Sequence, residues 1–363
     1  LPSDDTNAPI EKALHSANVI LATGGFAADR SSNSYLAQLR PEYLSMPATA
    51  GEFSTGDGIA MATRLGAGTV DMNKIQIHPT GWVDPSDPLN PSKVLAAELM
   101  RGVGGILLND FGERFCNELG TRAYVTDKMF QHDPHYSSTG KWSPNSTVPT
   151  FSLVLSSSAA NDGRKHVDLY THKKLLKKMS GIQQLADFMS VNVDTLRTSM
   201  DAYRVDAKNG IDRWGKVSFR GVPSSDLDNE IFYVGRVTPV LHYCMGGITI
   251  DITGNVLDEE QNVIHGLHAA GEVSGGVHGN NRLGGNSLLE CTVFGTIVGK
   301  KIPVLNHNTS DDGGDGDKIE QEEEEESVDG ERMVKFEELA SHNEPDDCWV
   351  AIHDQVYDLT AFA

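Results

Sequence analysis

The sequence predicts an α/β protein with a doubly wound sheet that is interrupted by an inserted α+β domain. Residues 19–26 (VILATGGF) and 266–272 (GLHAAGE) are short apolar runs that end in paired glycines and in a carboxylate. Such runs are typical of buried parallel strands that lead into turns at the nucleotide-binding edge of a sheet. Residues 277–289 then place an arginine beside a glycine-rich turn that opens an apolar helix. These three segments indicate a nucleotide-binding domain.

Composition changes along the chain predict five segments with different roles. They are, in order, part of a nucleotide-binding domain (1–72), a capping and substrate domain (73–242), the rest of the nucleotide-binding domain (243–304), an acidic disordered linker (305–331) and a further partial domain (332–363). Nothing before Val19 supplies the G-x-G-x-x-G turn with which doubly wound dinucleotide domains begin. The chain is therefore expected to start inside the first domain.

Apolar spacing predicts three helices in these segments. Residues 54–66 begin with a serine and a threonine suited to capping a helix, and residues 175–189 and 193–207 have the amphipathic pattern of a separate lid. Residues 238–252 then return to strand-like sequence. Residues 264–304 complete the nucleotide fold with a strand, a turn and a helix.

The composition limits the partners and the compartment. In 363 residues, a hydrophobic content of 39% can bury one large core or two ordinary ones. The formal net charge of −21 argues against nucleic acid and anionic membranes as partners. Residues 311–331 hold twelve acidic residues and one lysine, so about half of the acidic excess lies there. No apolar run approaches the roughly 20 residues that a membrane span needs.

The cysteines and histidines show no pattern of a structural or metal site. The cysteines at 116, 244, 291 and 348 form neither a C-x-x-C pair nor a regular spacing. They predict isolated reduced thiols, with a disulfide as the alternative, and favour a cytoplasmic or mitochondrial compartment. The N-terminal residues carry no targeting pattern from which a localisation can be read. The histidines lack metal-ligand spacing, so no metal site is expected.

The helix that opens within residues 277–289 is a predicted anion site. First-turn N–H groups have no partner within a helix, and the helix dipole places about half a positive charge there. The pair GE at 271–272 is followed ten residues later by R-x-G-G-N-S-L at 282–288. This arrangement resembles the C-terminal FAD-binding motif of the fumarate reductase and succinate dehydrogenase flavoprotein family.

Four further blocks extend the resemblance over residues 17–304. They are TGDG at 55–58, QIHPT at 76–80, the run 98–122 and HYCMGG at 242–247. The resemblance implies a glutathione reductase-like FAD-binding domain, truncated at its N-terminus, with a capping domain that closes over the substrate. It also implies FAD-dependent reduction of fumarate to succinate, and hence a small dicarboxylate substrate.

The resemblance assigns substrate binding to His78, His242 and Arg282. A guanidinium binds a carboxylate through two parallel hydrogen bonds and keeps its charge, which suits Arg282. The two histidines can donate to carboxylate oxygens and help to twist one carboxyl group out of conjugation. The alternative for a histidine such as His78 is a purely structural role.

The resemblance assigns proton donation to Arg122. An arginine rarely gives up a proton, so a relay must restore it. Glu98 and Arg101 match the family's relay pair and share one face if residues 96–101 are helical. The alternative for this pair is an exposed salt bridge. Ala97 stands where the family usually has a small hydroxylic residue, which leaves the identity of the substrate open.

The FAD contacts that the resemblance implies lie in both parts of the nucleotide-binding domain. Asp57 and Glu272 match acidic residues that bind FAD hydroxyls, although Asp57 would also suit the start of a helix. Ser287 and Leu288 match the helix start at the pyrimidine end of the flavin, where a positive field stabilises the reduced form. The remaining predicted contacts lie in the two glycine turns and are Thr23, Gly24, Gly25, Gly284 and Gly285.

Residues 334–362 resemble the start of a cytochrome b5 domain, whose heme-ligating HPGG motif would follow beyond Ala363. The resemblance implies heme only where the rest of that domain is present. Electrons are then expected from a cytochrome b5 module, a reduced flavin nucleotide or an NADH-linked reductase.

Other functions stay open at this stage. Within the same reaction class, the alternatives are succinate oxidation and reduction of another enoate such as urocanate. In a different class, the missing pyrophosphate turn favours an inactive fragment, or pseudoenzyme, that serves as a binding module and holds FAD weakly.

Overall fold

The computed structural model describes residues 15–143 and 146–302, together with strand residues 343–344, 347–352 and 355–358. The chain divides into two compact units, Leu1–Val304 and Leu305–Ala363. The acidic linker expected at 305–331 lies outside the described residues. Among the described residues, no helix is both long and apolar enough to cross a bilayer.

The first unit contains a small sheet on the nucleotide-binding side. Strand β1 (Val19–Leu21) pairs in parallel with β10 (Val263–Ala269), and β9 (Asn255–Leu257) lies antiparallel on the other edge of β10. The predicted parallel arrangement is therefore confirmed. The predicted burial is wrong for the first two residues of β1, which are 48% and 47% exposed. Strand β1 is the edge of this sheet, so no described strand covers its outer side.

Two helices flank this sheet, and both begin after a glycine. Helix α2 (Asp57–Arg64) follows Gly56, which has φ 83° and leaves no role for a serine or threonine cap. The predicted capping is thus wrong, because the left-handed backbone at Gly56 makes the turn instead. Helix α10 (Asn286–Lys301) follows Gly285, with φ 84°, as the glycine-rich turn predicts.

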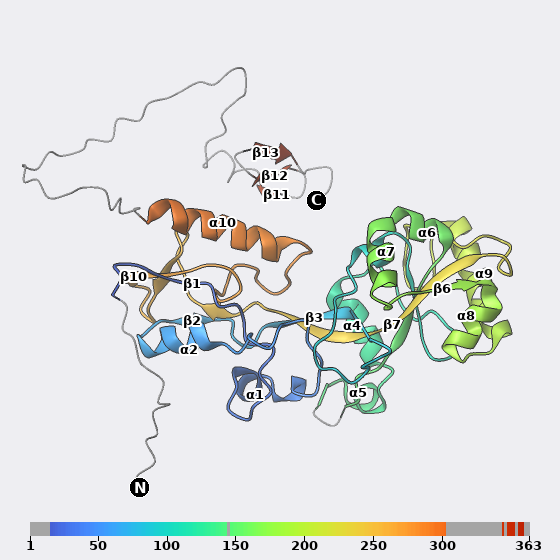
Figure 1. The fold of residues 1–363 in the computed structure, drawn as a ribbon, viewed down its shortest axis with the longest axis horizontal. Helices are drawn as coiled ribbons and strands as arrows, with labels where there is room; N and C mark the ends of the chain where they lie inside the picture. The colour runs from blue at the N-terminus through green and yellow to red at the C-terminus, as the bar shows by residue number, and fades with distance from the viewer. Residues whose placement is uncertain (1–14, 144–145, 303–342, 345–346, 353–354, 359–363) are drawn as a thin grey trace, which may run out of the picture. The chain divides into compact units, whose positions relative to one another are not determined.

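A second, antiparallel sheet forms the centre of the inserted region. Strand β3 (Ile75–Trp82) pairs with the long strand β7 (Ile231–Cys244), and the sheet continues through β5 (Phe151–Leu155) to β4 (Ile106–Leu108). Strand β6 (Lys177–Ser180) also pairs with β7. Figure 1 shows β3 and β7 running between the elements of the small sheet and those of the inserted region. The chain leaves the first domain through β3 and returns to it through β7.

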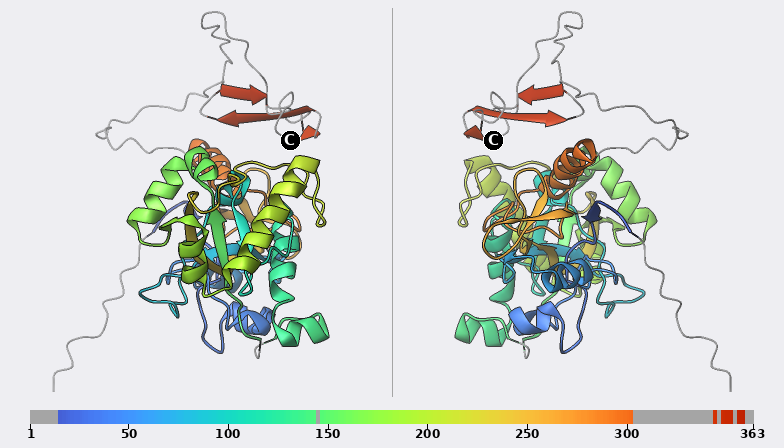
Figure 2. Two further views of the ribbon diagram at one scale, coloured as in Figure 1. Left: turned by 90° about the vertical axis from the view of Figure 1, so that its right-hand side faces the viewer. Right: turned by 90° about the vertical axis from the view of Figure 1, so that its left-hand side faces the viewer.

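Helices surround the second sheet. Helix α4 (Arg122–Phe130) packs on β3, and helices α8 (Gly181–Met189) and α9 (Val193–Asn209) pack together at one end of the sheet (Figures 1 and 2). Helix α9 confirms the predicted helix at 193–207. The prediction for 175–189 is wrong in its first part, where residues 177–180 form β6 because they pair with β7.

The remaining elements are short. They are α1 (Tyr35–Leu39), the 3-10 helix η1 (Pro41–Tyr43), β2 (Thr69–Val70), α3 (Leu99–Gly102), α5 (Pro134–Thr139), α6 (Ser157–Asp162), α7 (Arg164–His172) and β8 (Gly247–Ile248). In the second unit, β11 (Asn343–Glu344), β12 (Asp347–Ile352) and β13 (Gln355–Asp358) form an antiparallel sheet. Cys116, Cys244 and Cys291 are free thiols, as expected.

A buried ionic cluster ties the loop before α4 to the segment after α9. The Glu118 carboxylate is fully buried and accepts from Arg114 Nε and Nη2, each at 2.8 Å, and from Lys216 Nζ at 3.0 Å. Arg114 Nη2 also donates to Asp212 at 2.7 Å. Because buried charges are stable only when paired, each member depends on the others.

Glu118→Ala is expected to destabilise the first unit by about 3–5 kcal/mol, because it leaves Arg114 and Lys216 buried with an uncompensated charge. Urea unfolding followed by circular dichroism measures the change. The control is Arg164→Ala, which removes the exposed Arg164–Asp168 pair and should leave the unfolding midpoint unchanged. Equal midpoints for Glu118→Ala and the control would contradict the prediction.

Candidate active site

The pairing of β3 with β7 brings His78 and His242 together. Their rings meet edge to face, with centroids 5.3 Å apart. The Thr80 N–H donates to His78 Nδ1 at 3.2 Å, and His242 Nδ1 lies 2.8 Å from Thr49 Oγ1. His78 Nε2 is buried and has no hydrogen-bond partner among the described residues. His78 Nδ1 also lies 3.2 Å from the Thr80 carbonyl oxygen, so the tautomer with the proton on Nε2 is the one that could donate to a ligand.

Both imidazoles are held neutral. Burial lowers the pKa of His78 well below its usual range, and the nearby Arg101 guanidinium lowers it further. Burial also lowers the pKa of His242 to about 3, with Arg282 and Arg122 adding to the effect. A neutral imidazole binds a carboxylate as a hydrogen-bond donor without titrating near neutral pH.

Arg122 and Glu98 form a direct ion pair. Arg122 is the first residue of α4, and Thr121 caps this helix by accepting from the Tyr124 N–H. Arg122 Nη2 and Nε donate to Glu98 Oε2 at 2.9 and 3.2 Å. Glu98 precedes α3 and also lies 3.6 Å from Arg101, between Oε1 and Nη2. The structure thus brings the predicted proton donor, Arg122, together with both residues of the predicted relay pair.

Arg101 is buried, so its alternative as an exposed surface residue is wrong. Its side chain is 1% exposed, and Nη1 donates to the main-chain carbonyl of Glu118. Within the described part of the chain, Nε and Nη2 of Arg101 have no hydrogen-bond partner. Burial lowers the pKa of Arg101, while the charge of Glu98 raises it.

Arg282 is the third buried arginine of this group. It is 2% exposed, its Nη1 donates to the Leu283 carbonyl at 3.1 Å, and its guanidinium lies 4.5 Å from the centroid of the Tyr243 ring. Nε and Nη2 have no hydrogen-bond partner in the residues that the structure describes. Burial and the charge of Arg122 lower the pKa of Arg282. Two donors that are buried and unpaired suit a carboxylate ligand.

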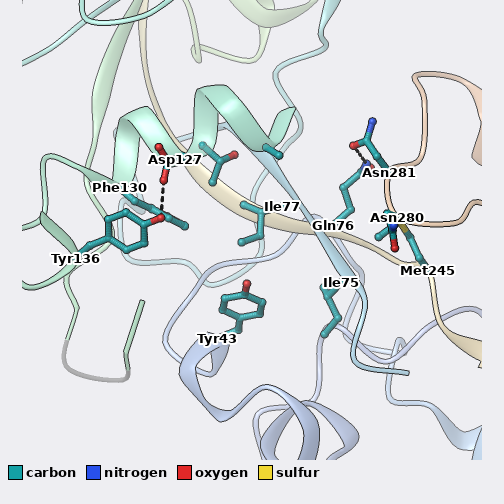
Figure 3. Close-up of a pocket in the computed structure, with 12 residues that line it drawn as sticks. Tyr43, Ile75, Gln76, Ile77, Asp127, Phe130, Tyr136, Met245, Asn280 and Asn281 are labelled. Atoms are coloured by element: carbon teal, nitrogen blue, oxygen red, sulfur yellow. Dashed lines mark hydrogen bonds between the residues drawn. The ribbon is translucent and has the colours of Figure 1, made fainter. Parts of the chain in front are cut away.

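Gln76, which the sequence reasoning missed, joins Arg122 to the glycine-rich turn. Its Oε1 accepts from Arg122 Nη1 at 2.7 Å, while its Nε2 donates to the Arg282 carbonyl at 2.8 Å and to Asn281 Oδ1 at 3.1 Å. Gln76 and Asn281 line a cavity of about 240 Å³. Figure 3 shows these two side chains joined by their hydrogen bond. The position of Gln76 within the QIHPT block was the available signal.

The predicted FAD contacts that follow β1 and β10 lie close to one another and to the start of α2. Thr23, Gly24 and Gly25 follow β1, and Glu272 follows the neighbouring parallel strand β10. A Cβ at Gly25 would lie 2.7 Å from Glu272 Oε1, and a Cβ at Gly58 would lie 2.1 Å from Thr23 Oγ1. Asp57, next to Gly58, opens α2, which also fits its alternative as a helix-start residue. Bare backbone beside a carboxylate fits the ribose and phosphate groups of FAD.

The second set of predicted contacts surrounds the start of α10. Ser287 is half-buried and Leu288 is 75% exposed in the first turn. A Cβ at Gly284 would lie 3.4 Å from Glu98 Oε2 and 3.5 Å from Arg122 Nη2. The glycine turn therefore lies against the relay residues on one side and opens the helix on the other.

Comparisons with known proteins show which families the chain is similar to. The pattern of the FAD binding domain family matches residues 3–288, and that of the cytochrome b5-like heme/steroid binding domain matches residues 335–363. The chain is 45% identical to fumarate reductase of Schizosaccharomyces pombe, over 78% of this chain and 52% of the relative. It is 38% identical to fumarate reductase 1 of Saccharomyces cerevisiae, over 80% and 60%.

Among solved structures, the open conformation of a flavocytochrome c3 fumarate reductase is similar, with a TM-score of 0.59 and 32% identity over 78% of this chain and 45% of that chain. The chain spans about half the length of these relatives.

Glu272→Gln is expected to remove a pH-dependent loss of stability. Burial raises the pKa of Glu272 from 4.5 to about 7. The contribution of this carboxyl is present below its unfolded pKa and is lost as the pH rises through the folded pKa. The free energy of unfolding of the variant, relative to wild type, should therefore rise by about 1–3 kcal/mol between pH 4.5 and pH 8.

Urea unfolding of the protein without added FAD at several pH values measures this difference. The exposed Glu260→Gln is the matched control and should follow the wild-type curve. Parallel curves for wild type and Glu272→Gln would contradict the prediction.

Proposed function

Because the chain belongs to the FAD-binding flavoprotein family that includes fumarate reductases, we propose that it binds FAD and reduces fumarate to succinate. The family match confirms the resemblance stated from the sequence. The observation that carries the proposal is the set of buried side-chain nitrogens on His78, Arg101 and Arg282 that have no hydrogen-bond partner within the part of the chain that is described. Buried donors without acceptors are costly, and a ligand with carboxylate oxygens would satisfy them.

The charges of the site favour a dianionic substrate. Arg101 and Arg122 are buried and pair with the carboxylate of Glu98, and the buried Arg282 feels the charge of Arg122. The charge of Arg122 acts unfavourably on both other guanidiniums. A dicarboxylate would offset this excess of positive charge, with Arg282 binding one carboxylate through two parallel hydrogen bonds. The neutral histidines would donate to carboxylate oxygens without adding charge.

Arg122 is the proposed proton donor, and Glu98 with Arg101 its relay. FAD, once bound and reduced by the electron donor, would supply the hydride that adds to one alkene carbon. Arg122 would place a proton at the other carbon, and Glu98, 2.9 Å from its Nη2, would hold the guanidinium and return the proton. Gln76 fixes the opposite side of Arg122 through Nη1, so the guanidinium cannot rotate freely. Two anchors give the orientation that proton transfer requires.

The electron donor is proposed to be a cytochrome b5-type module, a reduced flavin nucleotide or an NADH-linked reductase. The match of residues 335–363 to the cytochrome b5-like family supports the first of these. Binding of heme is proposed for a protein that includes the rest of that domain.

Ala97 is the feature that favours a related substrate as the second candidate. Ala97 supplies no hydroxyl, and its N–H donates to the Tyr170 hydroxyl oxygen at 3.1 Å. A substrate carboxylate thus lacks one donor that the family usually provides, so another enoate such as urocanate remains the second candidate. Succinate oxidation uses the same groups in reverse.

The full-length protein, loaded with FAD, is expected to reduce fumarate when reduced methyl viologen supplies electrons. Rates with fumarate, urocanate and acrylate, together with succinate oxidation by an artificial acceptor, decide among the candidates. Fumarate should give the highest kcat/KM, because it presents two carboxylates to the three arginines. No turnover with any alkene would favour the inactive binding module instead.

Two substitutions separate substrate binding from proton delivery. Arg282→Ala should raise KM steeply, because its interaction already exists in the ground state, and should also lower turnover, because the substrate loses the group that orients it for reaction. Arg122→Ala should lower turnover by about 10²–10⁴-fold or more, while fumarate still perturbs the flavin spectrum. Arg122→Lys should keep slight activity, and Glu98→Gln should slow turnover without abolishing binding. Near-normal turnover of Arg122→Ala would show that Arg122 is not the proton donor.

A further inference from the structure

A second buried polar cluster lies beside Arg282 and has no part in the proposed reaction. We call it the Glu290 cluster, and it consists of Tyr243, Ser274, His278 and Glu290. The Tyr243 hydroxyl donates to Glu290 Oε2 in a short hydrogen bond, and His278 Nε2 lies 2.8 Å from the same oxygen. Ser274 Oγ lies 3.2 Å from Oε1. Glu290 is 3% exposed, although it belongs to helix α10, most of whose residues are not buried.

The cluster fixes the orientation of the Tyr243 ring. The hydroxyl of the ring is held by Glu290, and the His278 ring meets it edge to face with centroids 5.4 Å apart. The face of this ring lies 4.5 Å from the guanidinium of Arg282. A buried guanidinium on an aromatic face is stabilised by the electron density of the ring. The face of the Tyr243 ring therefore packs against the guanidinium of Arg282 and supports its position.

Few hydrogen bonds hold the guanidinium of Arg282, so its contact with the Tyr243 ring matters for its orientation. One of its nitrogens, Nη1, donates to the neighbouring Leu283 carbonyl, whereas Nε and Nη2 have no partner among the described side chains and backbone groups. The two nitrogens that suit a carboxylate are thus not held by any hydrogen bond. What holds the plane of the guanidinium is its contact with Tyr243 and the backbone bond at Nη1.

The acidic groups near Arg282 also stabilise its guanidinium in this position. Arg282 is destabilised as a cation by burial and by Arg122, and the carboxylates of Glu272 and Glu290 oppose this effect. A carboxylate that accepts from the Tyr243 hydroxyl also adds electron density to the ring, which strengthens the contact with a cation above it. Glu290 thereby supports Arg282 without touching it.

We propose that Glu290 is a positioning residue for substrate binding, which acts through Tyr243 to hold the guanidinium of Arg282 in the orientation that receives a carboxylate. The inference rests on the proposed function, in which Arg282 binds the dicarboxylate. His278 is the second anchor of the same carboxylate, so the glycine-rich segment that carries Arg282 and the helix that follows it are joined by one buried acid.

The test uses the full-length protein loaded with FAD and compares Glu290→Gln, Tyr243→Phe and Thr292→Ala. Glutamine keeps the shape and an acceptor oxygen but removes the charge, and phenylalanine keeps the ring but frees it from Glu290. Each of these two variants should raise KM for fumarate about threefold to tenfold, the range expected for loss of support to a buried cation–π contact. The value of kcat should change less than twofold, because Arg122 and Glu98 are untouched. Thr292→Ala, an exposed neighbour on α10, should match wild type.

The outcomes separate this inference from the proposed function. If wild type reduces fumarate but both variants keep its KM, or lose kcat at an unchanged KM, the positioning role of Glu290 is wrong and the proposed function stands. If wild type neither binds nor reduces fumarate, both are wrong. If Glu290→Gln loses FAD or fails to fold, Tyr243→Phe decides, since it removes a single oxygen atom. A titration of the nonreactive dicarboxylate malonate, followed by the flavin spectrum, should give the same ratios as KM.

Discussion

The antiparallel pairing of β3 with β7 is the interaction on which the site depends. Its register sets Gln76 opposite Tyr243 and His78 opposite Val240, so the QIHPT and HYCMGG blocks, about 160 residues apart in the sequence, meet on adjacent strands. The same two strands link the nucleotide-binding side to the inserted region (Figure 1). Any shift of this register by one residue would turn the histidines to the opposite face of the sheet.

The candidate site contains buried polar groups that a ligand would satisfy. Arg101 and Arg282 are buried, and two nitrogens of each guanidinium have no hydrogen-bond partner among the described residues. The ionic cluster of Glu118 shows the opposite solution, because there each charge meets a partner within 3.0 Å. The two groups of charges are joined where Arg101 donates to the Glu118 carbonyl. Charges that are all paired indicate a structural role, whereas buried polar groups without partners indicate a candidate binding site.

The sequence predicted which residues gather at the candidate site better than it predicted the residues that hold them in place. His78, Arg122, His242 and Arg282 stand in glycine-rich or polar blocks that are recognisable in the sequence, whereas Gln76 owes its role to partners 46 and 206 residues away. Local spacing cannot report such contacts. For the same reason the strand at 177–180 was missed, since its pairing with β7 overrides a helical pattern. The start of α2 was predicted with a side-chain cap, where a left-handed glycine makes the turn.

The glycine-rich turn couples the two halves of the proposed chemistry. Arg282 stands three residues before Gly285, the residue that precedes α10, so the group that would bind substrate and the helix start that would face FAD cannot move independently. Gln76 holds the Arg282 carbonyl, and Glu290 lies one turn into α10 and holds Tyr243 beneath the guanidinium. Anchors on both sides of a flexible glycine segment fix its conformation, because the backbone freedom of the glycines is then limited at each end. The substrate and cofactor sides of the site are therefore set by one short segment of chain.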